Sequence, residues 1–459
     1  MLRKRSMVIT SITAVLLALS LGIVSAQERV QIRWFVGLGA GTDAPQIEAQ
    51  EAVVEEFNNS QDRIELVLEI VDNEQAPGVL STQIAAGNAP DIVGPVGILG
   101  RSQFPGAWLD LSELLTETNY DLSDFDQDLV EFYDIEGEGQ IGLPFAIFPS
   151  FLIYNVDLFD EAGIPYPPRN YGDPYVDWDG VEREWNFDTL REIAMILTVD
   201  SNGNDATMEE FNPDDIVQFG FAPQWTDYRG RLSLFGAGNF VDEEGNAVLP
   251  DHWRDGLYWY QQAMWEDYFI PNGVYGGADF MGGGNWFESG NLAMVHIHLW
   301  YLPCCTWGLA DVEYQLAPVP SYNGVTTAKM HGDTFSIMNT TEHPEEAFEV
   351  LTYLIGDKAE ELATLYGGMP ARLSLQDTYF DTISQNDPIA GRDLHWDIVV
   401  AGMSYTDNPS HEGPLPNLRE AEDVYNTWSG NLDNDPNFDL DTEIPRLLDS
   451  LQQVYDQSN

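Results

Sequence analysis

The segment 141–163, which reads IGLPFAIFPSFLIYNVDLFDEAG, constrains the fold more than any other feature of the chain. Pro144 and Pro149 interrupt its apolar run, and because proline cannot donate to a strand ladder, they limit the run to edge or crossing positions. A helix start at Asp157 follows, and Gly163 suits the position just past that helix. This pattern predicts a chain that leaves one α/β lobe and enters another.

Strands and helices alternate before this segment. The pattern predicts strands over 32–36, 64–71 and 89–93 and helices over 45–58 and 77–86. Such alternation favours a mostly parallel sheet with helices on both faces. Ligands of such sheets bind beyond the carboxyl ends of the strands, where 39–43 and 94–97 lie.

The second part of the chain also contains predicted strands. They cover 217–222 and 293–298, followed by a strand over 314–320 that returns to the first lobe and a strand over 334–338 in the first lobe. About 430 residues remain after the N-terminal segment, and this length exceeds a single ordinary core. We therefore expect two lobes.

The N-terminus has the pattern of a secretory signal peptide. Three basic residues at 3–5 precede an apolar run over 7–24 and a small-residue cleavage site ending at Ala26. The alternative is an uncleaved N-terminal anchor, since the apolar run is close to spanning length. We expect a secreted protein, either periplasmic or on the cell surface.

The composition narrows the chemical class of ligand that the protein can bind. Removing residues 1–26 takes away three basic residues and no acidic one, so the formal net charge goes from −57 to about −60. Such a surface disfavours nucleic acid, anionic membranes and acidic ligands. The 13 Trp, 20 Tyr and 22 Phe favour carbohydrate, because aromatic faces stack on the C–H faces of sugars.

Six further segments appear in an order that resembles family 1 of the extracellular solute-binding proteins of ABC importers, the maltose- and oligosaccharide-binding group. They are AGNAPDIV (86–93), QFGFA (218–222), FESGNLAM (287–294), APVPSYNG (317–324), HPEEAFEVLTYLI (343–355) and GGMPAR (367–372). The segment 141–163 resembles the hinge-crossing strand of the same family.

This resemblance implies a type II periplasmic-binding-protein fold, with two α/β lobes joined by a hinge and a ligand cleft between them. The expected division is 1–26 signal peptide, 27–145 plus 315–355 first lobe, and 146–314 plus 356–459 second lobe. The implied protein is a monomer without catalysis or cofactor, which delivers a carbohydrate to the permease subunits of an ABC transporter.

The resemblance also suggests aromatic ligand contacts. Trp300 aligns with the family's sugar-stacking tryptophan, and Trp225 and Tyr228 follow QFGFA, where the family often adds an aromatic. Phe148, within the crossing strand, is expected to face the cleft. The alternative for each side chain is packing in a core.

Four polar residues are candidates for hydrogen bonds to the ligand. Thr42 and Asp43 lie between the first strand and a helix, where the alternative is capping of that helix. Asp333 precedes a first-lobe strand whose end borders the cleft in the family. Arg372 is either a ligand donor or part of a structural ion pair.

One loop has oxygen ligands at alternate positions, as calcium loops do. Its candidate ligands are Asp200, Asn202 and Asn204. The loop departs from the EF-hand pattern because its glycine falls at the fourth position instead of the sixth. Structural calcium and a solvated turn are both left open.

The two cysteines, Cys304 and Cys305, are adjacent. In an oxidising compartment they can form a strained vicinal disulfide, and two buried thiols are the alternative. A metal site that joins these thiols to His296, His298 and His331 has a spacing that fits no common zinc pattern.

Two other function classes remain. A secreted glycoside hydrolase needs two carboxylates across a sugar cleft, and 76 acidic residues always supply a candidate pair. A receptor for a non-sugar solute such as a peptide or polyamine would suit the negative surface. Among the three classes, the sugar receptor is the leading hypothesis.

Overall fold

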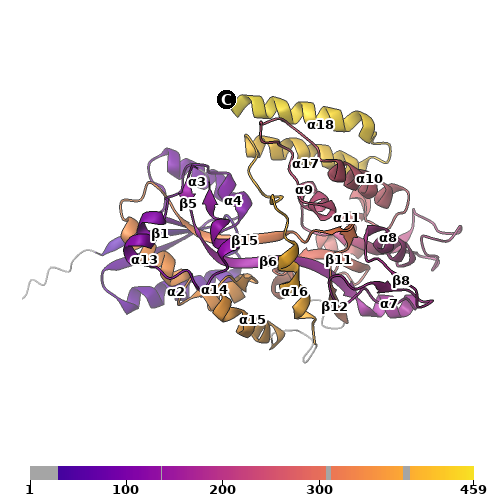
Figure 1. Cartoon of the computed structure of the whole chain (residues 1–459), viewed down its shortest axis with the longest axis horizontal. Coiled ribbons are helices and arrows are strands. Elements are labelled where there is room, and N and C mark those ends of the chain that lie inside the picture. The colour runs from indigo at the N-terminus through magenta and orange to yellow at the C-terminus, as the bar shows by residue number, and fades with distance from the viewer. Residues whose placement is uncertain (1–28, 136, 306–311, 386–392, 459) are drawn as a thin grey trace, which may run out of the picture.

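The computed structural model describes residues 29–135, 137–305, 312–385 and 393–458. The predicted signal peptide lies outside these ranges. Two lobes of mixed strands and helices lie side by side, and the strands β6 and β15 run between them (Figure 1). Within the described ranges, no helix is long and apolar enough to cross a membrane.

One ten-stranded sheet extends through both lobes. Its order is β2-β1-β3-β15-β6-β11-β10-β9, and β12 and β16 also pair with β6. The bounds are β1 Val30–Val36, β2 Ile64–Ile70, β3 Ile92–Val96, β6 Leu143–Asn155, β9 Val199–Asp200, β10 Ile216–Pro223, β11 Leu292–His298, β12 Tyr314–Ala317, β15 Met330–Ile337 and β16 Met369–Pro370. Three two-stranded ribbons complete the strands: β4 Asp134–Ile135 with β5 Gly139–Gln140, β7 Tyr175–Val176 with β8 Glu182–Arg183, and β13 Ser321–Tyr322 with β14 Val325–Thr326.

β6 is the crossing strand that the sequence predicts. Its residues up to Pro149 pair with β15, and from Ser150 onward they pair with β11. Pro149 thus lies where the ladder changes partner, which is a position that tolerates the missing N–H. The strand therefore belongs to the first lobe in its first half and to the second lobe in its second half.

The first lobe forms as the strand–helix alternation predicts. β1 pairs in parallel with β2 and β3, whereas β15 pairs antiparallel with both β3 and β6. The sheet is therefore parallel at its edge and antiparallel where the lobes meet. The helices of this lobe are α2 Ala44–Ser60, α3 Ala76–Ala85, α4 Ile98–Ser102, α5 Ser112–Thr118, α6 Gln127–Glu131, α13 Pro344–Leu354, α14 Ala359–Tyr366 and α15 Leu373–Gln385.

The second lobe has the parallel pair β10 and β11 at its centre. An aromatic core, which includes Trp253, Tyr260 and Tyr425, lies under the C-terminal helices. The helices of this lobe are α7 Val156–Ala162, α8 Phe187–Ile196, α9 Tyr228–Leu232, α10 Asp251–Trp265, α11 Gly273–Gly276, α12 Tyr301–Cys305, α16 Trp396–Gly402, α17 Leu418–Asn434 and α18 Leu440–Tyr455.

The return to the first lobe differs from the prediction. β12 pairs with the second-lobe half of β6, so the predicted strand over 314–320 does not cross. The crossing is made by β15, which pairs with the first-lobe half of β6. The predicted lobe boundary at 355 is also wrong, because α14 contacts α2 and β16 pairs with Ala146 and Ile147, which places both elements in the first lobe.

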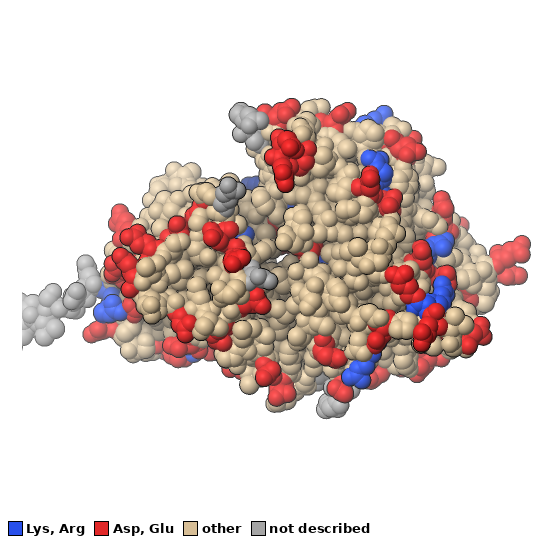
Figure 2. Space-filling model, viewed as in Figure 1, with Lys and Arg blue, Asp and Glu red and all other residues tan. Residues whose placement is uncertain are grey.

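Acidic side chains are spread over both lobes, and basic ones are few, as the composition requires (Figure 2). The same view shows a hollow between the lobes. The acidic residues are dispersed instead of gathered into a single patch on this face. The charge therefore favours solubility more than a particular docking site.

Candidate functional site

A cavity of about 530 Å³ lies between the two lobes. Its lining comes from the loop after β1, the loop after β3, the crossing strands, and loops of the second half of the chain. The lining residues are Gly37, Leu38, Gly39, Ala40, Gly41, Thr42, Asp43, Gln46, Asn73, Pro77, Gly97, Leu99, Gly100, Gln103, Phe148, Trp300, His331, Asp333, Tyr366 and Glu412. The cavity is therefore at the carboxyl ends of the first-lobe strands, as expected for such sheets.

The first-lobe wall is formed by two glycine-containing loops, 37–43 and 97–103. They approach each other closely, since a Cβ added at Gly100 would lie 2.7 Å from the carbonyl oxygen of Leu38. The side chain of Gln46, in the first turn of α2, accepts hydrogen bonds from the backbone N–H of Gly41 at 2.8 Å and of Asp43 at 3.3 Å. These contacts fix the loop that presents Thr42 and Asp43 at the cavity.

The second-lobe wall is aromatic. Trp300 follows β11 and lines the cavity, and the ring of Trp225 stacks on it with centroids 5.6 Å apart and planes 27° apart. Trp225 follows β10, and because β10 and β11 are parallel neighbours, their carboxyl ends bring the two rings together. Trp225 is 43% exposed, so the pair keeps an accessible aromatic surface. Phe148 on β6 and Tyr366 on α14 are further aromatic side chains of the lining.

Asp333 on β15 forms the floor between these walls. Its carboxylate oxygens lie where added Cβ atoms at Gly39 and Gly97 would be 3.5 and 3.3 Å away. No hydrogen-bond donor reaches this carboxylate in the part of the chain that the structure describes. Burial, together with the carboxylate of Glu412, raises the pKa of Asp333 to about 7. Asp333 is thus an acceptor without a partner, held at the cavity.

Beside the floor, four of the seven histidines form a row. The ring centroids of His296 and His298 are 6.1 Å apart, those of His298 and His331 are 3.7 Å apart, and those of His331 and His411 are 5.3 Å apart. Burial lowers the pKa of His296, His298 and His331 well below the usual value. These three rings are therefore neutral.

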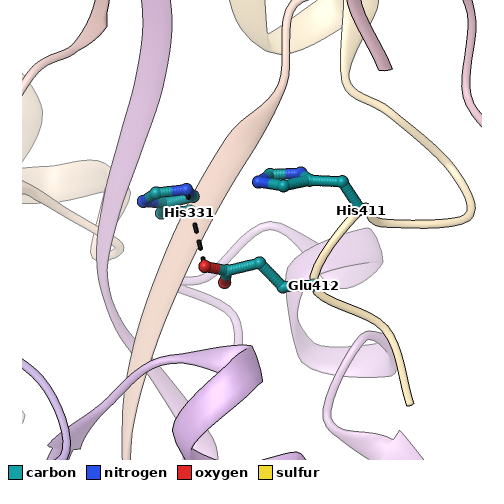
Figure 3. A group of neighbouring side chains, drawn as sticks. All are labelled: His331, His411 and Glu412. Atoms are coloured by element: carbon teal, nitrogen blue, oxygen red, sulfur yellow. Dashed lines mark ion pairs between the residues drawn. The ribbon is translucent and has the colours of Figure 1, made fainter. Parts of the chain in front are cut away.

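His331 and His411 meet the carboxylate of Glu412 at the end of this row (Figure 3). The Nε2 atom of His331 lies 3.6 Å from Oε1 of Glu412. Nδ1 of His411 donates to the buried carboxylate of Asp407 at 2.7 Å. Within the described residues, the group that can hold a metal consists of His331, His411 and Glu412.

Tyr228 does not reach the cavity. The side chain is 3% exposed, and its hydroxyl donates to Asp433, a residue of α17. The guanidinium of Arg231 lies 4.6 Å above its ring. Tyr228 is a core residue of the second lobe, which corrects the predicted ligand role.

Arg372 is also occupied elsewhere. Its guanidinium donates to the carbonyl of Ile355 at 2.6 Å and to the hydroxyl of Tyr120 at 2.7 Å, and it pairs with Asp124 at 3.3 Å. The same group lies over the ring of Phe125. Of the two alternatives for this residue, the structure supports the ion pair.

The carboxylate of Asp200 is buried within its own loop. It accepts hydrogen bonds from the backbone N–H of Asn202 at 2.8 Å, of Asn204 at 3.0 Å and of Asn212 at 3.0 Å. These bonds are those of a turn closed by an aspartate. Calcium at this loop stays a prediction.

Cys305 is disulfide-bonded, and Cys304 is the only other cysteine of the sequence. The side chain of Cys304 lies outside the described residues. The bonded state agrees with the expected vicinal pair, which lies at the end of α12, the helix that begins directly after Trp300.

Sequence reasoning missed Gln46, Asn73, Gln103 and Glu412 as cavity residues. Gln46 had a local signal, because a glutamine three residues after Asp43 is typical of a capping box. Glu412 had none, since it comes from an irregular loop that reaches the floor from about 80 residues further along the chain.

Comparisons with known proteins agree with this architecture. A family model described as bacterial extracellular solute-binding protein matches residues 43–361. An arabinooligosaccharide-binding protein of Halalkalibacterium halodurans is 24% identical over 339 residues, which cover 72% of this chain and 69% of the relative.

Solved structures share the fold. An ABC substrate-binding protein of Listeria monocytogenes in complex with cycloalternan has a TM-score of 0.66 at 17% identity, covering 94% of this chain and 98% of its own. The maltotriose-binding protein of Thermus thermophilus has a TM-score of 0.60 at 17% identity, with 92% and 99% covered. The family match spans well over half of the sequence, and the chain therefore belongs to the bacterial extracellular solute-binding protein family.

Proposed function

We propose that this chain is the substrate-binding component of an ABC importer and that its ligand is an oligosaccharide. One observation carries the proposal: the interlobe cavity has Trp300, on which Trp225 stacks, on one wall and a polar, glycine-rich wall on the other. A sugar ring has apolar C–H faces and hydroxyls around its edge. A cavity with these two surfaces is suited to both.

The proposed roles follow from position. Trp300 and Trp225 stack on a sugar ring, and Phe148 extends this apolar surface. The hydroxyls of the sugar are paired with polar groups of the first lobe and the floor, namely Thr42, Asp43, Asp333 and Glu412. Each unpaired buried hydroxyl would cost about 1–3 kcal/mol, so this pairing decides which sugar fits.

The working cycle we propose is closure of the two lobes about β6 and β15. A ligand that touches both walls binds the closed state more tightly than the open state, and this difference drives the change. The closed monomer then delivers its ligand to the permease subunits of the transporter. No catalytic step is part of this cycle.

The ligands named for relatives and structural neighbours support a sugar. They include arabinooligosaccharide, mannotriose and maltotriose. These names belong to proteins of 24% identity or less, and they indicate a class of ligand instead of a particular sugar. The extracellular family also supports a protein that works outside the cytoplasmic membrane.

The test is thermal unfolding of the purified protein against arabino-, manno- and malto-oligosaccharides. A ligand present at 100 times its Kd stabilises the folded state by about 2.7 kcal/mol, which raises the unfolding temperature by a few degrees. Small-angle scattering of the same samples should show a more compact particle with the stabilising sugar. Unchanged melting with every sugar would contradict the carbohydrate assignment.

A second function has one observation in its favour, because Asp333 and Glu412 place two carboxyl groups at the same cavity. A glycoside hydrolase uses two such groups. If the protein releases reducing sugar from the oligosaccharide panel and Asp333→Asn abolishes this release, the function is that of a hydrolase and not that of a receptor. Binding without release supports the receptor.

A further inference from the structure

Three metal-ligating side chains converge at the floor of the cavity from two distant parts of the chain. His331 comes from β15, and His411 and Glu412 come from the loop that precedes α17. One ligand atom from each of the three side chains lies within 4.8 Å of the others (Figure 3). In this view the two imidazole rings lie side by side, and the carboxylate of Glu412 lies below them, joined to His331 by the dashed line.

The orientation of His411 is fixed by a second carboxylate. Asp407 accepts from Nδ1 of His411 at 2.7 Å and, on the same side chain, from the backbone N–H of Met330 at 3.1 Å. With Nδ1 paired to Asp407, Nε2 is the ring nitrogen left on the side of His331. A carboxylate behind a histidine in this manner is the usual outer partner of a metal-ligating histidine.

The position of His331 is fixed as well. Its ring stacks on that of His298, with centroids 3.7 Å apart, and its backbone is paired with Phe148 on β6. The bond from Met330 to Asp407 ties the loop of His411 to the strand of His331. The two segments are therefore coupled before any ion binds.

The charges around the cluster favour a cation. Glu412 lies within the cluster, and Asp407 lies directly behind it. The ammonium of Lys329, the residue directly before β15, donates to the hydroxyl of Thr226 at 2.6 Å. Two imidazoles and a carboxylate are ligands that suit Zn²⁺ and related transition metals better than Ca²⁺ or Mg²⁺.

We propose that His331, His411 and Glu412 bind a divalent transition metal, with Zn²⁺ as the preferred probe, at a site open to the interlobe cavity. His331 and Glu412 line the cavity, so a fourth coordination position faces it. Three protein ligands and one open position are typical of zinc sites that accept water or another molecule.

Binding requires a small adjustment. Ligand atoms about 2.0–2.1 Å from Zn²⁺ lie roughly 3.3–3.5 Å apart in a tetrahedron. The pair from His331 and Glu412, at 3.6 Å, already has this spacing. The remaining separation, at most 4.8 Å, closes if the loop of His411 moves toward β15 by about 1 Å.

The test is a titration of the chelator-treated full protein with Zn²⁺ in competition with a chromophoric chelator, without any sugar. We expect one Zn²⁺ per chain with a Kd of micromolar or lower. Glu412→Gln, which is nearly isosteric, and His331→Gln should each weaken binding at least tenfold. Asp407→Asn, at the positioning residue, should weaken it about 10–100-fold. The matched control is His343→Gln at the start of α13, whose side chain makes no cap hydrogen bond.

Two further measurements make the result decisive. Zn²⁺ should raise the unfolding temperature of the wild type and of His343→Gln but not that of Glu412→Gln, and the variants should melt cooperatively in chelator. Millimolar Ca²⁺ should not displace the ion. Three outcomes would overturn the proposal. The first is that the wild type retains no Zn²⁺ at 10 micromolar, which is roughly the upper limit of the expected Kd. The others are that both ligand variants bind Zn²⁺ as the wild type does, or that Ca²⁺ competes with Zn²⁺ equally. Sugar affinity is measured separately, so failure of the proposed function leaves this result intact.

Discussion

The first-lobe wall of the cavity is built around two glycine-containing loops, whereas the second-lobe wall presents Trp300, on which Trp225 stacks. The first wall is packed so closely that a single methyl group at Gly39 would meet the carbonyl of Pro95 in β3. The tryptophan pair instead leaves Trp225 nearly half exposed. A tightly packed wall fixes the positions of hydrogen-bonding groups, and an open aromatic wall accepts many sugar faces.

This difference suggests a division of work. The first wall and the floor discriminate between sugars, because each hydroxyl must find a partner there. The second wall supplies affinity with little discrimination, because stacking depends on area more than on the placement of hydroxyls. The predictions below test this division, in order of expected size.

Trp300→Ala should have the largest effect. Removing an aromatic anchor from a binding site costs about 2 kcal/mol, which corresponds to about a 30-fold loss of affinity for every sugar that binds. Calorimetric titration measures it. The control is Trp178→Ala, since Trp178 is 57% exposed and outside the cavity lining. An unchanged Kd for Trp300→Ala would show that the aromatic wall does not contribute to sugar affinity.

Gly39→Ala should damage the first wall. The added Cβ would lie 2.7 Å from the carbonyl oxygen of Pro95, so one loop must move, at a cost of about 1–3 kcal/mol. We expect about a tenfold loss of affinity and a lower unfolding temperature. Gly78→Ala is the matched control, because its Cβ meets nothing within 4 Å. If both glycine variants bind equally, the first wall is not tightly packed.

Asp333→Asn should change affinity by about 1 kcal/mol. A hydrogen bond to a charged acceptor contributes about 1.5–3 kcal/mol and one to a neutral acceptor about 0.5–1.5, so we expect about a fivefold weaker Kd. The loss should differ between sugars, in contrast to that of Trp300→Ala. Equal losses across the panel would argue against discrimination at the floor.

Glu422→Gln should alter stability without altering affinity. Burial, together with Asp227, raises the pKa of Glu422 to about 7. Since this exceeds the unfolded value of about 4.3, the folded state binds more protons between these values, and wild-type stability falls as the pH rises from about 4.5 to 7. After solvent screening, the variant should be more stable by about 1 kcal/mol at pH 8 and nearly equal at pH 4.

Denaturant unfolding at these two pH values measures this effect. Glu420→Gln, at an exposed position of the same helix, is the control and should change stability little. A variant that is no more stable than the wild type at pH 8 would show that Glu422 is fully solvated.

Tyr228→Phe should have the smallest effect. It removes one hydrogen bond to Asp433, which keeps its ion pair with Arg231, and should cost about 0.5–1 kcal/mol of folding stability. Sugar affinity should not change, because the side chain is in the core. A loss of sugar affinity at unchanged folding stability would show instead that Tyr228 contributes to ligand binding.

Much of the first wall could be predicted from the sequence because its signals are local. The strand end before residue 37, the glycine-rich turn and the helix start at Pro45 follow each other directly, so Thr42 and Asp43 were placed correctly at the cavity lining. The crossing strand was likewise predicted from its two prolines, and Pro149 lies where β6 changes partner. Trp300 was placed by family resemblance and lines the cavity.

The errors arise where a side chain has two local environments available. Tyr228 comes three residues after the exposed Trp225, yet the first turn of α9 places it in the core beside Asp433. Arg372 follows a short strand near the cavity, but Asp124 and Tyr120 attract it to the opposite side. Sequence spacing does not distinguish these outcomes, because both depend on partners about 200–250 residues away in the chain.

The sequence by itself determined the two-lobed plan, the crossing strand and the residues at the ends of the first strands, because periodicity, prolines and turn residues act over short distances. Only the tertiary structure decided that His331, Asp333, His411 and Glu412 share one floor. The reason is that β15 and the loop before α17 are brought together by long-range pairing and by the bond from Met330 to Asp407. No local sequence pattern indicates that two such distant segments come into contact.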